Sequence, residues 1–181
     1  MENKPQVLQF NATLLKPKNS AEDFVAFVVI PKEISQVFPR RGRTGADIHV
    51  NQYTFQAILE PDGQLSHWLK IDHQTFASAK LAFAEHYIFE ITPVLEQPEP
   101  VVPDDFDQAL ANCIGARQVW LDTTTIARVD WIHWIESAKQ AKTRAKRIAD
   151  ACNMLKEGKS RVCCFDTSGF YSKAFKLPAC S

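Results

Sequence analysis

The feature that most constrains the fold of this chain is a change in hydrophobic period half-way along it. Near the start, Leu8, Phe10 and Ala12 alternate with polar residues, which is the period-two pattern of a half-buried β-strand. From Trp134 onward, apolar residues recur in steps of four and three, which is the period of an amphipathic helix. A proline-rich segment, residues 93–103, separates the two patterns and favours an extended linker. We therefore expect two domains of different class.

The first half has the spacing of a small β-barrel. Apolar or alternating runs predict short strands at residues 8–14, 24–30, 46–51, 53–60, 65–71 and 86–95. Pro61, Asp62 and Gly63 form a turn signal, because proline presets φ and glycine tolerates positive φ. The segment at 31–38 predicts a short helix or turn, and the segment at 73–85 fits either a short helix or a loop. About six short strands favour a mostly antiparallel barrel or pseudobarrel, which removes exposed sheet edges.

The second half has helical period. Residues 104–120 place their apolar side chains on one helical side, and Asp122 with the threonines after it marks a second helix start. Residues 131–159 predict one amphipathic helical segment, and Gly158 is suited to end it. The apolar stripe would allow a continuous helix, but a break near Thr143 stays open. Three tryptophans are expected to anchor the core of this bundle: Trp120, Trp131 and Trp134.

These patterns divide the chain into four parts and predict an α+β fold. A β-barrel domain is expected at residues 5–95, a proline-rich linker at 96–103, and a domain of about three helices at 104–159. The remaining tail, residues 160–181, is rich in aromatic residues and lacks helical period. We expect this tail to pack as extended chain over one of the domains.

Charge is balanced overall but divided unevenly along the chain. The 21 basic and 21 acidic residues give a formal net charge of zero. Residues 1–105 hold 9 basic and 14 acidic side chains, net −5, whereas residues 106–181 hold 12 and 7, net +5. Either the two halves attract each other, or the basic half faces an anionic partner.

Several classes of protein are disfavoured by what the sequence lacks. No window approaches the roughly 18 apolar residues of a membrane-spanning helix, and the N-terminus has no signal-peptide pattern, so we expect a cytoplasmic protein with reduced cysteines. Adjacent Cys163 and Cys164 lack the C-x-x-C spacing of zinc and redox sites. No two histidines have the H-x-x-x-H or H-E-x-x-H spacing of a metal site. The sequence also lacks a glycine-rich nucleotide-binding loop and a G-x-S-x-G nucleophile elbow. The sequence therefore predicts no metal, no cofactor and no enzymatic activity.

One run of residues resembles a known family. It contains Ala138-Lys139, Thr143-Arg144, Arg147-Ile148, Leu155 and Gly158-Lys159. This run is similar to the helical domain of the bacteriocin-protection family, also called YdeI or OmpD-associated. The strand-rich first half resembles the small β-barrel domain of unknown function that is often fused ahead of it. The resemblance implies a double-split-like barrel, and a link to tolerance of bacteriocins, antimicrobial peptides and envelope stress, without catalytic residues.

The sequence departs from the family pattern at two turns of the barrel. Asn51 is followed by Gln52, where the family usually has Asn-Gly. Ala84 and Glu85 precede the last strand, where the family usually has Gly-Asp. The departures leave open what the backbone does at these two turns.

Two basic clusters are candidate binding surfaces. We predict a surface for an anionic or protein partner at Lys139, Arg144, Arg147 and Lys159. The competing interpretation is a solvated helix face whose arginines are bound to the acidic barrel domain or to helix C-termini. A second cluster, in a glycine-containing loop predicted to be exposed, offers alternative nucleic-acid contacts at Arg40, Arg41 and Arg43.

The function predicted from these observations is that of a non-enzymatic interaction protein of the bacteriocin-protection type, with a protein partner. One alternative is a nucleic-acid-associated protein that uses the barrel and its basic loop. A second alternative is small-ligand binding in the mouth of the barrel. The sequence leaves the oligomeric state open between monomer and dimer, and does not identify the partner.

Overall fold

A computed structural model describes residues 6–19, 23–162 and 176–181 of the chain. Among these residues the chain separates into two compact units. The barrel unit contains residues up to Pro98 and the end of the chain, and the helical unit begins at Glu99. The α+β fold class expected from the sequence is confirmed.

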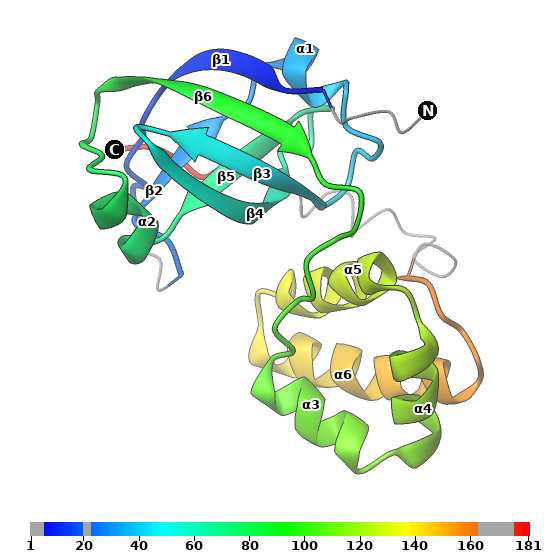
Figure 1. The fold of residues 1–181 in the computed structure, drawn as a ribbon. Helices are drawn as coiled ribbons and strands as arrows, with labels where there is room; N and C mark the ends of the chain where they lie inside the picture. Colours follow the sequence, from blue (N-terminus) through cyan, green and yellow to red (C-terminus); the bar gives the residue numbers. More distant parts are fainter. Residues whose placement is uncertain (1–5, 20–22, 163–175) are drawn as a thin grey trace, which may run out of the picture. The chain divides into compact units, whose positions relative to one another are not determined.

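The barrel unit is built on an antiparallel sheet that almost closes on itself (Figure 1). Its described residues form β1 (Leu8–Thr13), β2 (Ala26–Val29), β3 (Thr44–Val50), β4 (Tyr53–Pro61), β5 (His67–Ile71) and β6 (His86–Pro93). Their order in the sheet is β1-β6-β3-β4-β5-β2. Leu15 and Phe27 exchange two backbone hydrogen bonds of 2.9 Å, which join the two ends of the sheet.

The predicted strands are confirmed, and their alternation explains the core of the barrel. Phe10 stacks on Phe89 with ring centroids 5.6 Å apart, and both are buried. Two short helices lie in the connections, α1 (Lys32–Ser35) and α2 (His73–Ser78). The ambiguous segment at 73–85 is therefore a helix followed by a loop.

Two turns of the barrel take a left-handed backbone conformation without glycine. Asn51 and Gln52 have φ of 48° and 67° in the β3–β4 hairpin, and Ala84 has φ of 63° before β6. Positive φ at both central residues is the geometry of a type I′ hairpin turn. The positions where the family usually has glycine thus keep the conformation that glycine favours, at some cost in stability.

The helical unit contains four helices in its described residues, rather than about three. They are α3 (Asp104–Ala111), α4 (Ile114–Asp122), α5 (Thr125–Glu136) and α6 (Ala141–Lys156). The segment 131–159 is not one continuous helix: it breaks between α5 and α6, at residues 137–140, close to Thr143 where the sequence left a break open. The Ser137 hydroxyl donates to the carbonyl of Trp134 at 2.9 Å, a local bond that competes with continuation of the helix.

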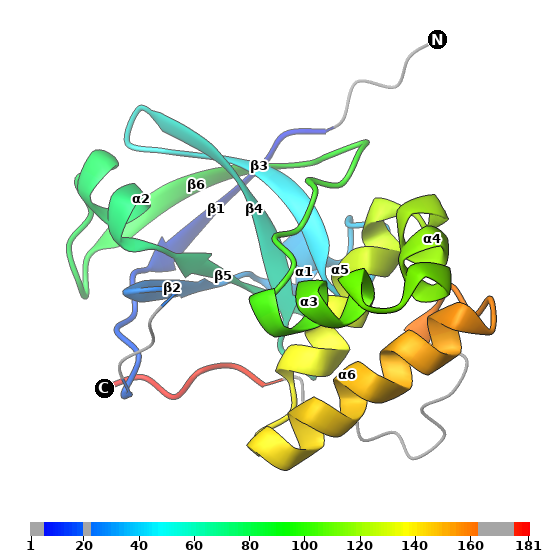
Figure 2. The ribbon, with the colours of Figure 1, turned by 90° about the horizontal axis from the view of Figure 1, so that it is seen from below.

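Helix α6 packs against the other three helices of its unit (Figure 2). Its buried apolar residues are Ile148, Ala151, Cys152 and Leu155. The three predicted tryptophan anchors are also buried. Gly158, with φ of 86°, ends α6 as predicted: its amide bonds to Leu155 and the next amide to Met154, a Schellman motif.

The end of the chain belongs to the barrel unit. Pro17 and Cys180 form an antiparallel bridge, and the Lys18 amide donates to the Ala179 carbonyl at 2.7 Å. Residues 176–181 therefore run as extended chain beside the segment that follows β1. The rest of the predicted tail, residues 163–175, lies outside the described residues.

Candidate functional site

The solvent-facing side of α6 carries a row of lysine side chains. Lys142, Lys146 and Lys156 are exposed. Because each residue advances about 100° around a helix, Lys142 and Lys146 lie on the side away from the buried Ile148 and Leu155, whereas Lys156 lies at the edge of that side, with its Cγ close to Gly115 of α4. The 16 residues of α6 span about 24 Å. A row of this length suits an extended anionic surface better than a single small ion.

Two of the predicted contact residues flank this row. Lys139 is exposed in the turn before α6, and Lys159 is exposed just after it, with its Nζ 3.3 Å from the Glu157 carboxylate. Within the row, the Lys146 ammonium lies 2.6 Å from the Asp150 carboxylate. Exposed ion pairs of this kind are weak, so they offset the positive charge only in part. We call the five residues together the lysine face: Lys139, Lys142, Lys146, Lys156 and Lys159.

Arg147 lies on the inner side of α6, with only 8% of the residue exposed. Its Nη1 donates to the Trp134 carbonyl at 2.5 Å and to the Ser137 hydroxyl at 2.7 Å. The guanidinium also lies over the Trp134 ring, 5.3 Å from its centroid. Arg147 therefore satisfies a carbonyl in the last turn of α5, where helix carbonyls lack intrahelical partners. Its predicted contact with a partner would require it to leave these bonds.

Arg144 connects two helices of the same unit. Its Nε and Nη2 donate to the two carboxylate oxygens of Asp105, at 2.7 and 2.9 Å, in a bidentate pair. Asp105 stands in the first turn of α3, so the pair ties α6 to the start of α3. The hydrogen bond from Arg144 holds the pKa of the Asp105 carboxyl below its usual range. The family run thus contains two arginines that stabilise the helical unit.

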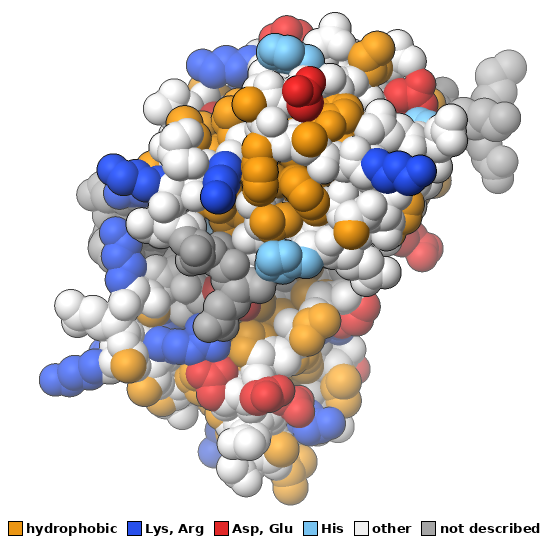
Figure 3. Space-filling view, turned by 90° about the vertical axis from the view of Figure 1, so that its left-hand side faces the viewer, with side chains coloured by type: hydrophobic (Ala, Val, Ile, Leu, Met, Phe, Trp, Pro, Cys, Tyr) orange, Lys and Arg blue, Asp and Glu red, His pale blue; other side chains and the backbone are white. Residues whose placement is uncertain are grey.

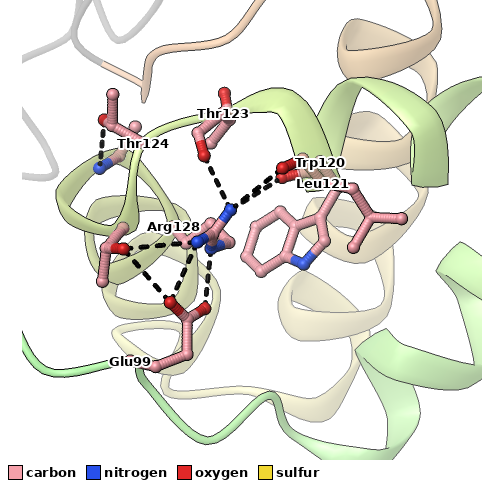
Figure 4. Close-up of polar contacts among 8 residues, drawn as sticks. Glu99, Trp120, Leu121, Thr123, Thr124 and Arg128 are labelled. Carbon is pink, nitrogen blue, oxygen red and sulfur yellow. Dashed lines mark hydrogen bonds and ion pairs between the residues drawn. The ribbon is translucent and has the colours of Figure 1, made fainter.

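A third arginine, which the sequence reasoning missed, has a similar role (Figure 4). The Nε and Nη2 of Arg128 donate to the Glu99 carboxylate at 2.7 and 2.9 Å. Its Nη1 donates to the Thr123 carbonyl at 2.6 Å and lies 3.3 and 3.4 Å from the carbonyls of Trp120 and Leu121. Arg128 therefore caps the C-terminal end of α4, and its hydrogen bonds lower the pKa of Glu99. No periodicity in the sequence marks it.

The predicted basic loop of the barrel unit is only partly exposed. The Nε of Arg43 donates to the Glu60 carboxylate at 2.8 Å, and the two side chains are 12% and 10% exposed. The prediction that Arg43 is exposed was therefore wrong, because it is buried against an acidic residue of β4. Arg40 is half-buried and Arg41 is exposed. Whether these arginines contact nucleic acid stays a prediction.

A pocket of about 250 Å³ lies beside this loop in the barrel unit. The residues that line it are Ser35, Gln36, Phe38, Pro39, Arg40, Arg41, Leu65 and His67. The Ser35 Oγ lies 2.6 Å from His67 Nδ1, and His67 Nε2 lies 2.9 Å from the Gly42 carbonyl. Because a carbonyl only accepts, Nε2 carries the proton and Nδ1 of the neutral ring accepts from the Ser35 hydroxyl. Sequence reasoning did not connect Ser35 to His67, since no motif spans their separation.

Hydrophobic side chains gather on one face of the barrel unit, with Lys or Arg side chains beside them (Figure 3). An aromatic pair reaches the surface of this unit: the Phe76 and Phe83 rings lie 5.0 Å apart, and Phe83 is 37% exposed. The Lys16 ammonium lies 5.5 Å from the Phe83 ring centroid. Since Phe76 also packs against the barrel core, this aromatic pair is an outward continuation of that core.

Neither metal-ligand clusters nor membrane spans are found in the part of the chain that the structure describes. Over residues 6–19, 23–162 and 176–181, no three His, Cys, Asp or Glu side chains are grouped to hold a metal ion. Within the same ranges, no helix has the length and apolar character needed to cross a bilayer.

Comparison with known families identifies both units. Residues 99–158 match the sequence model of the family described as Bacteriocin-protection, YdeI or OmpD-Associated. Over these 60 residues the helical unit is similar to this family. Residues 10–86 match a domain of unknown function, DUF1905, which here is the barrel from β1 to the start of β6. Both resemblances predicted from the sequence are confirmed, in the same order. No curated protein matches the chain.

The basic residues that carry the resemblance to the bacteriocin-protection family fall into two groups in the structure. Arg144 and Arg147 point to other helices of the domain and hold α3 and α5 in place against α6. Lys139 and Lys159 are exposed at the two ends of α6. In this chain the arginines therefore stabilise the helical unit, whereas the two lysines have exposed side chains.

Proposed function

We propose that this protein is a non-enzymatic, cytoplasmic interaction protein of the bacteriocin-protection type, and that the lysine face binds an acidic surface of a protein partner. The observation that supports the proposal is the division of basic residues in the helical unit. Arg128, Arg144 and Arg147 are engaged within the unit, while the five lysines along α6 stand at its surface.

Charge and length favour an extended acidic partner. Five lysines stand beside two acidic residues, Asp150 and Glu157, so the net charge of this surface is 5 − 2 = +3. Lysine ammonium groups are compact and well hydrated on flexible stems, and they bind carboxylates without demanding one geometry. Such a surface accelerates association with an acidic partner more than it strengthens the final complex.

The experiment is capture of partners from native lysate by the full chain, at low and at moderate salt. The test variant replaces Lys142, Lys146 and Lys156 with glutamine, which removes three charges from the exposed side of α6. Glutamine has helix propensity close to that of lysine, so the variant should keep its fold. We expect the wild-type chain to retain a protein partner that the test variant loses.

The matched control replaces three exposed lysines of the barrel unit with glutamine: Lys18, Lys32 and Lys80. This control changes the net charge by the same amount but leaves α6 intact. If the control variant loses the partner as fully as the test variant, net charge rather than the lysine face is responsible. If the test variant keeps the partner, the proposal is wrong.

The nucleic-acid alternative makes a different prediction in the same assay. Binding to phosphate backbone weakens steeply with salt, because condensed counterions are released. Nucleic acid that is captured at low salt and lost in an Arg40→Gln, Arg41→Gln variant would favour that alternative. Arg43 is a poor test residue, since its removal would take the nearer ion-pair partner from the largely buried Glu60 and leave only Lys70, at 3.6 Å.

The family description supports a role in bacteriocin protection for the same surface. If the lysine face carries that role, the triple glutamine variant should fail to restore tolerance of bacteriocins or cationic peptides in cells that lack the protein. The barrel-unit control should restore it. Equal restoration by both variants would separate the tolerance phenotype from the lysine face.

A further inference from the structure

The pocket beside α1 combines four features that no part of the proposed function uses. It is concave, it is lined by two arginines, it contains a buried serine–histidine pair, and its other walls include apolar residues. We propose that this pocket binds a small oxyanion, a carboxylate or a phosphate group, and that binding is coupled to uptake of a proton by His67.

The size of the pocket limits the ligand. Its volume of about 250 Å³ lies below the usual range of roughly 300–1,000 Å³ for sites that take drug-sized molecules. Phe38, Pro39 and Leu65 supply apolar wall, and the polar groups converge from α1, the loop after it and β5. A small acid or a single phosphate group therefore fits better than a polymer.

The charge of the lining residues selects an anion. Arg40 and Arg41 both line the pocket, and among the described residues no carboxylate lines it. Guanidinium groups present paired N–H donors that match the oxygens of carboxylate and phosphate. For Arg41 the described residues supply no hydrogen-bond or ion-pair partner, so its side chain can turn toward a ligand.

The serine–histidine pair supplies the coupling to protons. In the neutral state the Ser35 hydroxyl donates to His67 Nδ1, so its hydrogen is engaged by His67 and is not offered to a ligand. When His67 takes up a proton, Nδ1–H becomes the donor and Ser35 Oγ the acceptor. The Ser35 hydroxyl hydrogen can then donate to an oxygen of the ligand. One proton thus adds both a positive charge and a hydrogen-bond donor to the site.

The groups around His67 shift its pKa in opposite directions. Burial lowers its pKa below the ordinary value, while the hydrogen bond to the Gly42 carbonyl and the charges of Asp62 and Glu60 raise it. Arg43 pairs with Glu60 and reduces its influence, and Arg40 and Arg41 add positive charge across the pocket. An anion bound against the arginines offsets their charge and favours protonated His67.

The experiment uses sulfate, an oxyanion that does not itself titrate near neutral pH. The full chain is titrated with sodium sulfate at about pH 6 and about pH 8, pH values on either side of the ordinary histidine pKa. Sodium chloride at the same ionic strength serves as the reference. We expect saturable changes in amide resonances confined to residues 35–42 and 65–67, with binding about three- to tenfold tighter at the lower pH.

Variants identify the groups responsible. Arg41→Gln should abolish the saturable changes, whereas Arg117→Gln, which removes the same group from an exposed position on α4, should leave them intact. His67→Gln should remove the difference between the two pH values. Should His67→Gln fail to fold, Ser35→Ala is the second variant, and it should reduce the difference because the donor to the ligand is lost.

Three outcomes would overturn the proposal: no saturable change with sulfate, equal binding by wild type and Arg41→Gln, or changes located on α6. Binding that is unaffected by pH would overturn the proton coupling. Acetate and inorganic phosphate, compared at about pH 8 where phosphate is mainly the dianion, distinguish the two ligand classes. The anion that binds more tightly identifies the ligand class, and failure of both anions to bind contradicts the site.

Discussion

Replacing Arg147 with methionine tests whether this arginine is a structural residue or a contact residue. The substitution keeps much of the apolar stem but removes the guanidinium that donates to Trp134 and Ser137. Hydrogen bonds from charged donors contribute about 1.5–3 kcal/mol each, and the stacking on Trp134 contributes about 0.5–1 kcal/mol. Because these contributions overlap, we expect unfolding of the helical unit to become easier by about 2–4 kcal/mol.

The assay is urea unfolding of the full chain, followed by tryptophan fluorescence and by hydrogen exchange of the Ser137 and Ala138 amides. These two amides bond to carbonyls in the last turns of α5, so they report the helix end that Arg147 supports. The control is Lys146→Met, at a neighbouring position of α6 with a side chain that is 74% exposed. For this exposed residue we expect a change within about 0.5 kcal/mol.

Equal stability of the Arg147→Met and Lys146→Met variants would refute the structural interpretation. Loss of the partner by a fully stable Arg147→Met variant would instead support the contact role predicted from the sequence. The same pair of variants therefore distinguishes a helix cap from a binding residue.

Three further predictions concern backbone strain and pH. Gln52→Gly and Ala84→Gly should each stabilise the barrel unit by about 0.5–1 kcal/mol in urea unfolding, because glycine tolerates positive φ; an unchanged or lower midpoint would contradict this. Because the pKa of Asp105 is lowered in the folded chain, its pair with Arg144 stabilises the helical unit at pH values above the ordinary aspartate pKa. This stabilisation is lost as the pH falls through the pKa that Asp105 has in the folded chain. In urea unfolding at acid pH, the stability of an Arg144→Gln variant should therefore depend less on pH than that of the wild type. Because burial lowers the pKa of His67, the folded chain binds a proton at His67 less readily than the unfolded chain. The barrel unit should therefore lose stability in chloride buffer as the pH falls below about 6.5. A urea-unfolding midpoint that does not change with pH would be inconsistent with a buried neutral ring.

Strands, turns and helix ends could be predicted because they depend on neighbours in the sequence. The alternation around Phe10 gave the inner face of β1, and Gly158 marked the end of α6. The sequence left open a break near Thr143, but the position of the break between α5 and α6 could not be predicted in this way. No proline or glycine stands at residues 137–140, and the end of α5 is stabilised by Arg147, which lies in the next helix.

Part of the candidate site was also predictable. Lys139 and Lys159 are exposed, as expected for contact residues at the ends of a helix. Arg144, Arg147 and Arg43 carry the same charge in the sequence but have buried or ion-paired positions in the structure. Which basic residue faces solvent depends on where Asp105, Trp134 and Glu60 are placed by other elements of the fold.

The sequence by itself determined the order of a barrel and a helical domain, the family that the helical domain resembles and the lysines at the ends of α6. These properties follow from periodicity and local spacing, which act over a few residues. Only the tertiary structure decided which arginines cap helices, and only it brought Ser35 to His67 across 32 positions of the chain. The physical reason is that hydrogen bonds and burial depend on distances in space, which the packing of separate elements sets.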